Sequence, residues 1–283
     1  MMGKQASTGS WIAAVVVVLG VVVAGVFLAR KALHPSPSVS SAPASAPANS
    51  THVSPAIAPI EHPISQADAG PANAATTALP ALDGSDEGVA SALATLAGSD
   101  ELSALLLRPQ IVARIVATID TLLRHELGSR MLPLRSPNGR FLAHDVDGQI
   151  VMDEQNGARY APYMQIVDKA DPQAVVAWYV HNYALFQHAY QQLGYPNGYF
   201  NDRLVKVIDD LLATPESAQS AALVRAKGGY VYADPALESL SSGQRLLLRI
   251  GPDNETAIKA KLRAIRSLLA GQNLHPASTA TAR

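Results

Sequence analysis

The chain has 283 residues, 22 basic and 23 acidic side chains and a formal net charge of −1. This near-neutral balance excludes the basic surface that nucleic-acid binders need, so no nucleic-acid partner is expected. Cysteine is absent, which excludes disulfides, thiolate metal sites and cysteine nucleophiles.

Residues 11–29 form an uninterrupted apolar segment with no charge and no proline. Nineteen residues at ~1.5 Å rise span roughly 28 Å, close to the ~30 Å hydrocarbon core of a bilayer. Arg30 and Lys31 end the segment, and Trp11 stands where an interfacial aromatic anchor is expected. A cleaved signal peptide is the alternative, but its apolar region is usually shorter, about 7–15 residues. We therefore predict a retained, single-pass transmembrane helix, with the membrane as a partner.

The flanking charges choose weakly between the two sides of the membrane, because one basic side chain precedes the helix and two follow it. The nearly uncharged segment beyond it favours export, which makes 1–10 a cytoplasmic N-terminus. Small residues four apart could also pair two such helices into a weak homodimer, although such residues are common in membrane helices. These residues are Gly20, Ala24, Gly25 and Ala29.

Residues 30–78 are dominated by Ala, Pro and Ser. They lack the large apolar side chains that offset the entropy of ordering, and their prolines block helix formation. We predict a disordered, low-complexity linker whose root-mean-square reach is roughly 40 Å. A disordered tail, 271–283, is predicted where Ser, Thr and Ala dominate again.

Between them, 79–270 shows helical periodicity, and about 190 residues suffice for one packed core. Capping signals predict where the helices begin and end. Helices are expected from Ser85 or Asp86 to Gly98, around Leu102–Leu106, from Pro109 through Leu122, from Pro172 to Gly194, after a cap at Asn201, after Asp234, after Ser241 or Ser242, and from Pro252 to Gly271.

Two stretches have strand character instead. Asp147-Gly148 is a strong turn signal between Phe141–Ala143 and Ile150–Met152, which predicts a β-hairpin. Gly228-Gly229 lies between two further apolar runs and indicates either a second hairpin or one broken strand. The predicted fold class is therefore mainly α: a compact multi-helix domain with one or two small β-hairpins.

Four segments resemble the domain of unknown function 3014 family of proteobacterial single-pass membrane proteins. The most specific is Leu193-Gly-Tyr-Pro-Asn-Gly-Tyr-Phe-Asn-Asp-Arg-Leu204. The others are Ala158–Tyr163, Ala233–Gln244 and Leu246–Asn254, so the resemblance covers roughly 79–270. It implies the same layout and a location in the bacterial inner membrane with a periplasmic C-terminal domain. It implies no activity.

The segment from Tyr195 to Arg203 is the candidate binding site, because loops held by rigid helices often carry binding groups. Its residues are Tyr195, Tyr199, Phe200, Asn201, Asp202 and Arg203. The structural alternative is that they form a Pro-Asn-Gly turn, a helix cap and an aromatic junction. No catalytic set, metal site or cofactor motif is recognised in the sequence.

These observations favour an uncharacterised, membrane-anchored binding or scaffolding module over an enzyme. The expected partner is an envelope protein or a glycan. The alternative is an envelope hydrolase that uses polar groups near Asn201–Arg203. A flat aromatic groove would favour the binding module, and a deep pocket with converging polar groups would favour the enzyme.

Overall fold

The computed structural model describes residues 59–68, 81–98, 101–126, 132–216, 221–226 and 229–270. The predicted anchor 11–29, the N-terminal segment 1–10 and the tail 271–283 lie outside these residues, as does most of the predicted linker 30–78. None of the helices within the described ranges is long and apolar enough to cross a membrane.

Helices dominate the described part of the chain, as the periodicity predicts. They are α2 (Asp86–Ala97), α3 (Glu101–Leu105), α4 (Ile111–Leu122), α5 (Ala161–Lys169), α6 (Pro172–His181), α7 (Tyr183–Gln192), α8 (Phe200–Leu212), α9 (Pro235–Glu238), α10 (Ser242–Arg249) and α11 (Pro252–Leu269). Short 3-10 turns are η3 (Ile64–Gln66), η4 (Leu82–Gly84) and η6 (Glu154–Tyr160).

Both predicted hairpins are present, and the second is a true hairpin rather than a broken strand. The strands are β1 (Ala143–Val146), β2 (Gln149–Met152), β3 (Leu223–Ala226) and β4 (Gly229–Tyr232). The turn between β1 and β2 places Asp147 and Gly148 at positive φ, as an Asp-Gly turn requires. The sequence does not predict that β2 pairs with β3 through Ile150 and Leu223, which joins the hairpins into one antiparallel sheet in the order β1-β2-β3-β4.

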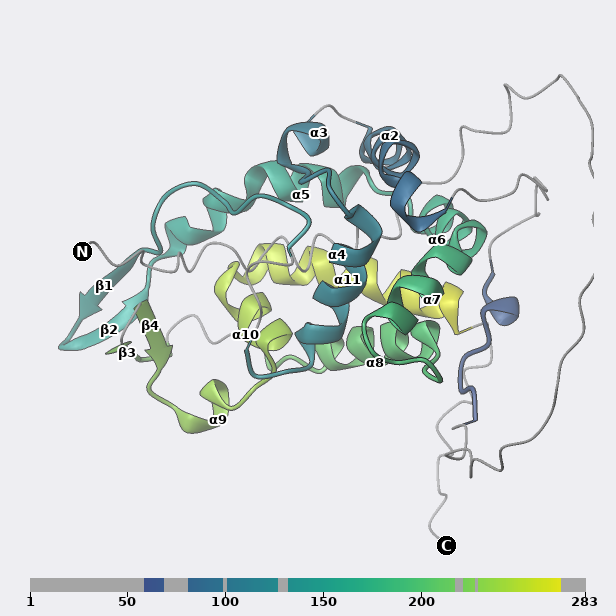
Figure 1. The fold of residues 1–283 in the computed structure, drawn as a ribbon. Helices are drawn as coiled ribbons and strands as arrows, with labels where there is room; N and C mark the ends of the chain where they lie inside the picture. Colours follow the sequence, from purple (N-terminus) through teal and green to yellow (C-terminus); the bar gives the residue numbers. More distant parts are fainter. Residues whose placement is uncertain are drawn as a thin grey trace, which may run out of the picture.

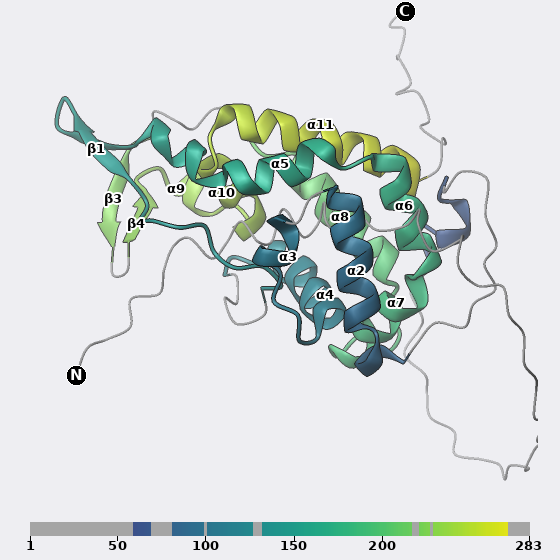
Figure 2. The same cartoon turned by 90° about the horizontal axis from the view of Figure 1, so that it is seen from above.

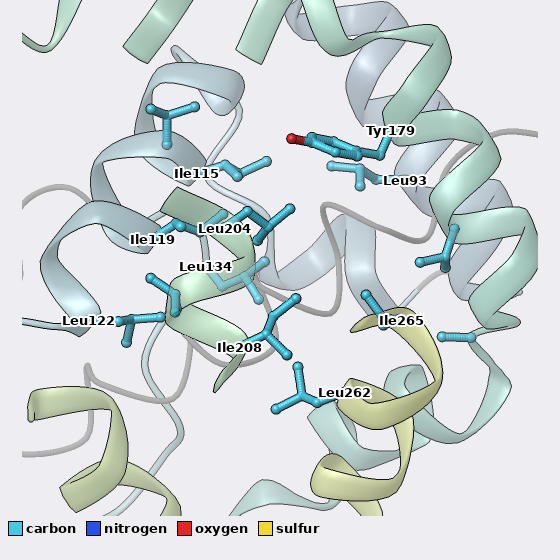
Figure 3. Packing of buried hydrophobic residues seen from close by; sticks show 14 of the residues in the cluster. Leu93, Ile115, Ile119, Leu122, Leu134, Tyr179, Leu204, Ile208, Leu262 and Ile265 are labelled. Atoms are coloured by element: carbon cyan, nitrogen blue, oxygen red, sulfur yellow. The ribbon is translucent and has the colours of Figure 1, made fainter. Parts of the chain in front are cut away.

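The main core lies where α4, α8 and α11 meet. Apolar side chains of the three helices face one another, as Figure 3 shows for Ile115, Ile119, Leu122, Leu204, Ile208, Leu262 and Ile265. A smaller cluster of Met152, Leu223, Tyr232 and Leu248 joins the sheet to α10. The sheet lies at one end of the domain and α6 and α7 at the other, in both views (Figures 1 and 2).

Two helices begin away from their predicted first residues. α4 begins at Ile111 rather than Pro109, because the Asp86 carboxylate accepts the N–H groups of Gln110 and Ile111, each at 2.7 Å. α8 begins at Phe200, so the prediction of Asn201 as its cap is wrong. The N-cap residue is Tyr199, and the Asn201 side chain makes a different contact, described below.

The predicted continuous helix from Pro172 to Gly194 is also wrong, because the chain breaks at Asn182 between α6 and α7. The Asn182 side chain donates to the carbonyl of Trp178 at 2.9 Å. Asn competes in this way with helical hydrogen bonding. The break lets α6 pack on α11 and α7 pack on α4, and so it shapes the end of the domain where the candidate site lies.

Candidate binding site at the start of helix α8

The connection between α7 and α8 is fixed by one glutamine and by two stacked rings. Gln187 Nε2 donates to the carbonyl of Gly198 at 2.7 Å, and its Oε1 accepts the N–H of Phe200 at 2.9 Å. The Tyr190 and Tyr195 rings stack with centroids 4.5 Å apart. The turn is therefore a rigid support for the residues that follow it.

The neighbouring tyrosine hydroxyls add hydrogen bonds without adding charge. Burial, with a further contribution from the Tyr199 hydroxyl, raises the pKa of Tyr183 well above its ordinary value. The neutral Tyr183 hydroxyl donates to Gln187 Oε1 at 2.8 Å. Tyr183 thus orients the glutamine amide that holds the turn.

Phe200, a predicted binding residue, belongs to the core. Its side chain is fully buried and packs against the rings of Tyr179, Phe186 and Tyr190 at centroid distances of 6.3, 6.0 and 5.4 Å. For this residue the structure agrees with the alternative that the aromatics fill the helix junction.

Tyr195 and Arg203 lie around a buried carboxylate, Asp120, in a group that we call the Asp120 cluster and that also includes Arg124. The Arg203 guanidinium lies 3.0 Å from Asp120 Oδ1 and donates to the Asp120 main-chain carbonyl. Arg124 lies 2.6 Å from Asp120 Oδ2, and the Tyr195 hydroxyl donates to the same oxygen at 3.2 Å. Removal of Arg203 would leave the buried Asp120 carboxylate without the less exposed of the two arginines paired with it, which is strongly destabilising. Loss of the Tyr195 hydroxyl would remove one of its hydrogen bonds, so both candidate residues support the fold.

The remaining candidates, Tyr199, Asn201 and Asp202, contact a distant part of the chain, and we call these three residues the clamp. Asp202 accepts the N–H of Glu61 at 3.1 Å on one carboxylate oxygen and the N–H of His62 at 2.6 Å on the other. Asn201 Nδ2 donates to the carbonyl of His62 at 2.8 Å. The Tyr199 hydroxyl accepts the N–H of Ile64 at 2.8 Å. All four hydrogen bonds reach main-chain groups.

The bound residues belong to a docked segment, 59–68, which falls inside the predicted linker 30–78. Its conformation follows from Pro63, whose φ of −59° and ψ of 132° are those of polyproline II. At the far end the Asp68 N–H donates to the Leu268 carbonyl at 2.8 Å, and Gln173 Nε2 donates to the Asp68 carbonyl at 2.7 Å. The segment therefore runs from the start of α8 to the end of α11, away from the sheet (Figure 1).

Apolar contacts accompany these hydrogen bonds. The side chains of Ile64 and Ala67 are partly buried and pack against the main core, whereas Glu61 and Ser65 are exposed. Burial of an aliphatic side chain stabilises by ~1.5–3 kcal/mol when it is complete. The domain therefore recognises the segment by its backbone shape and by a few apolar side chains.

The energies of docking are close to balance. The two bonds to the Asp202 carboxylate are worth ~1.5–3 kcal/mol each and the two neutral bonds ~0.5–1.5 kcal/mol each. Fixing the backbone of residues 61–64 costs ~1–2 kcal/mol per residue, which is of the same size. The contacts of Ile64, Ala67 and Asp68 favour the docked state.

The sequence points to the clamp but not to its surroundings. Tyr199, Asn201 and Asp202 are among the predicted residues, whereas Gln187, Asp120 and segment 61–64 are missed. Gln187 and Asp120 look like ordinary polar residues of amphipathic helices. The signal in the docked segment is Pro63 followed by an aliphatic residue, which is inconspicuous within a proline-rich stretch.

Residues 111–266 match the family described as "Protein of unknown function (DUF3014)". The chain belongs to this family. The DUF3014 match is narrower than the predicted 79–270. It includes the clamp and the Asp120 cluster, and it excludes the docked segment. No curated protein matches the chain significantly, and no solved structure does either.

Proposed function

We propose that this DUF3014 protein is a membrane-anchored binding or scaffolding module of the bacterial cell envelope. In this proposal 11–29 is the inner-membrane anchor, which could also pair weakly between two copies, and the helical domain is periplasmic. The clamp is the binding site, and its partner is a peptide segment of an envelope protein. The apolar segment 11–29 and the proline-rich composition of 30–78 support this layout.

The observation that carries the binding role is that the clamp binds main-chain groups of a peptide. Asp202 and Tyr199 accept N–H groups from three residues, and Asn201 donates to a carbonyl between them. A peptide backbone supplies such alternating donors and acceptors at fixed spacing. Main-chain hydrogen bonds of this kind contribute affinity in many peptide-recognition modules. This pattern favours a protein partner over a glycan.

The enzyme alternative has less support from the same residues. Both oxygens of Asp202 and the amide nitrogen of Asn201 bind the docked segment, and Arg203 is paired with Asp120. Two cavities of about 620 and 650 Å³ lie elsewhere. One is lined by residues of α2 and α3, the other by residues of η6, α5 and α11. Within the described residues no group of His, Asp and Glu is arranged to hold a metal ion.

Site-specific crosslinking in living cells tests the binding role. A photoreactive residue replaces Lys206, which is exposed one turn after Asp202 on α8. We expect a defined envelope protein to crosslink to the otherwise unchanged chain and to be lost in the Tyr199→Phe/Asp202→Asn variant. Both changes keep the side-chain shape, so the fold should persist.

Asp168→Asn is the matched control, because this exposed carboxylate lies on α5, outside the clamp. It should crosslink the same protein. An identical crosslinking pattern in the clamp variant and the control, or no crosslinked protein in any of them, would contradict the proposal.

A further inference from the structure

The clamp already holds a ligand, which is part of its own chain. The N–H groups of residues 61, 62 and 64 and the carbonyl of residue 62 are bound. Position 63 needs no donor, and proline occupies it. Position 64 is an isoleucine whose side chain packs on the main core.

These contacts define a sequence pattern for the ligand. Positions 61, 62 and 64 must keep an N–H, so they cannot be proline. Proline at position 63 removes no bond and presets the polyproline II backbone, which lowers the entropy lost on binding. The position after the proline takes an aliphatic side chain. The pattern is therefore two non-proline residues, a proline and an aliphatic residue.

The form of this pattern with isoleucine after the proline occurs twice in tandem, at residues 57–60 and 61–64. Glu61-His62-Pro63-Ile64 occupies the clamp, and Ile57-Ala58-Pro59-Ile60 directly precedes it. These are the only two Pro-Ile pairs in the whole sequence. One four-residue slip of the chain would bring the second copy to the clamp with the same donors.

The docked segment leaves one clamp group unused. Asn201 is fully buried, and its Oδ1 atom has no hydrogen-bond partner among the described residues. A buried acceptor without a partner costs free energy, which a ligand with one more donor would recover. The resident segment is therefore an incomplete ligand that a better one can replace.

We propose that residues 61–64 are an intramolecular competitor for the clamp, and that the partner is a peptide of another protein with the same Pro-aliphatic pattern. This inference rests on the proposed binding function of the clamp. Because residues 69–80 connect the segment to the domain, its effective concentration at the clamp is high, of the millimolar order typical of short linkers. The apparent affinity of the clamp for the partner falls in proportion to the fraction of clamps that the segment leaves free.

The test uses the full chain in detergent and a fluorescent peptide with the sequence of residues 59–68 as the probe. Ala58→Pro/His62→Pro removes an N–H from both copies of the pattern and frees the clamp. His62→Ala is the matched control, because it changes the side chain and keeps the N–H. We expect the double-proline variant to bind the probe roughly tenfold more tightly than the control or the unchanged chain, and Asp202→Asn to abolish this gain.

A distance measurement follows docking without any partner. Because the chain has no cysteine, Ser65→Cys and Lys206→Cys place two spin labels at chosen sites. The chain that carries only the two labels, and the labelled His62→Ala control, should each give a narrow distance distribution centred at a short distance. The labelled double-proline variant should give a longer and broader distribution.

Equal distances and equal probe affinities in all variants would overturn the intramolecular competition. A lengthened distance without probe binding would overturn the proposed ligand pattern. If both readouts agree with the inference while crosslinking in cells finds no partner, the proposed envelope function fails and the competition stands.

Discussion

At the scale of single residues, Gly198 shows why the α7–α8 turn needs glycine. A Cβ atom at this position would lie 2.8 Å from Cε1 of Tyr190 and 3.0 Å from Cβ of Tyr195. The first distance is shorter than real Cβ contacts, and Tyr190 is held by stacking on Tyr195. The glycine thus permits the close packing that positions the clamp.

Gly198→Ala should therefore destabilise the domain by about 1–3 kcal/mol, the usual cost of overpacking. Gly88→Ala is the control, because nothing lies within 4 Å of a Cβ there and the residue is inside α2. Alanine in a helix interior is favoured over glycine by ~0.5–1 kcal/mol, so this change should stabilise. Urea unfolding of both variants measures the difference. Equal effects would show that the turn is loosely packed.

Tyr163 supplies a pH dependence with a defined window. Burial raises its pKa to about 12, whereas an unfolded tyrosine titrates near 10. The folded state favours the neutral form, so this contribution to stability is complete below about pH 10 and is lost as the pH rises towards 12. The neutral hydroxyl donates to the Arg135 carbonyl at 2.7 Å.

Tyr163→Phe should lower the free energy of unfolding by ~0.5–1.5 kcal/mol at about pH 8, the net worth of a hydrogen bond. The difference in unfolding free energy between the variant and the unchanged protein should shrink between about pH 10 and 12, because Tyr163 titrates there and phenylalanine does not, whereas the other tyrosines are common to both proteins. Denaturant unfolding over this pH range checks it. A gap that widens with pH would contradict the sign of the shift.

At the scale of elements, several predictions that rest on short local signals in the sequence are confirmed. The Asp-Gly turn predicts the first hairpin, and Asp234-Pro235 correctly predicts the start of α9. The predicted starts of α4 and α8 are wrong because tertiary contacts determine them. Asp86 of α2 sets the start of α4, and Asn201 turns from a cap into a contact for His62. No local signal indicates that His62, in a proline-rich segment, will donate its N–H to Asp202, which lies 140 residues further along the chain.

Ser241 at the start of α10 tests the role of a local cap. Its hydroxyl accepts the N–H of Gln244 at 3.1 Å in a capping box and donates to Asp210 at 2.6 Å. Ser241→Ala should cost about 1 kcal/mol, the typical value for a lost N-cap. Ser91→Ala, at an exposed position inside α2, should cost little. Thermal unfolding distinguishes them, and an equal loss in both would rule out the cap as the cause.

At the scale of the whole molecule, the docked segment changes how far the domain would lie from the proposed anchor. For the predicted linker, 30–78, the expected reach is roughly 40 Å. With the segment held on the domain, the predicted linker between the proposed anchor and the domain shortens to 30–58, for which the expected reach is roughly 30 Å. Release of the segment by a partner would therefore lengthen the tether as well as free the clamp.

The clamp holds the main chain of residues 61–64. Amide hydrogen exchange of the full chain tests it most directly, because Glu61, His62 and Ile64 donate the N–H groups concerned. We predict that these amides exchange at least about threefold more slowly than in an unstructured peptide. Tyr199→Phe/Asp202→Asn should remove this protection. Exchange at the unstructured rate in the unchanged protein, with no change in the clamp variant, would contradict docking of residues 61–64 at the clamp.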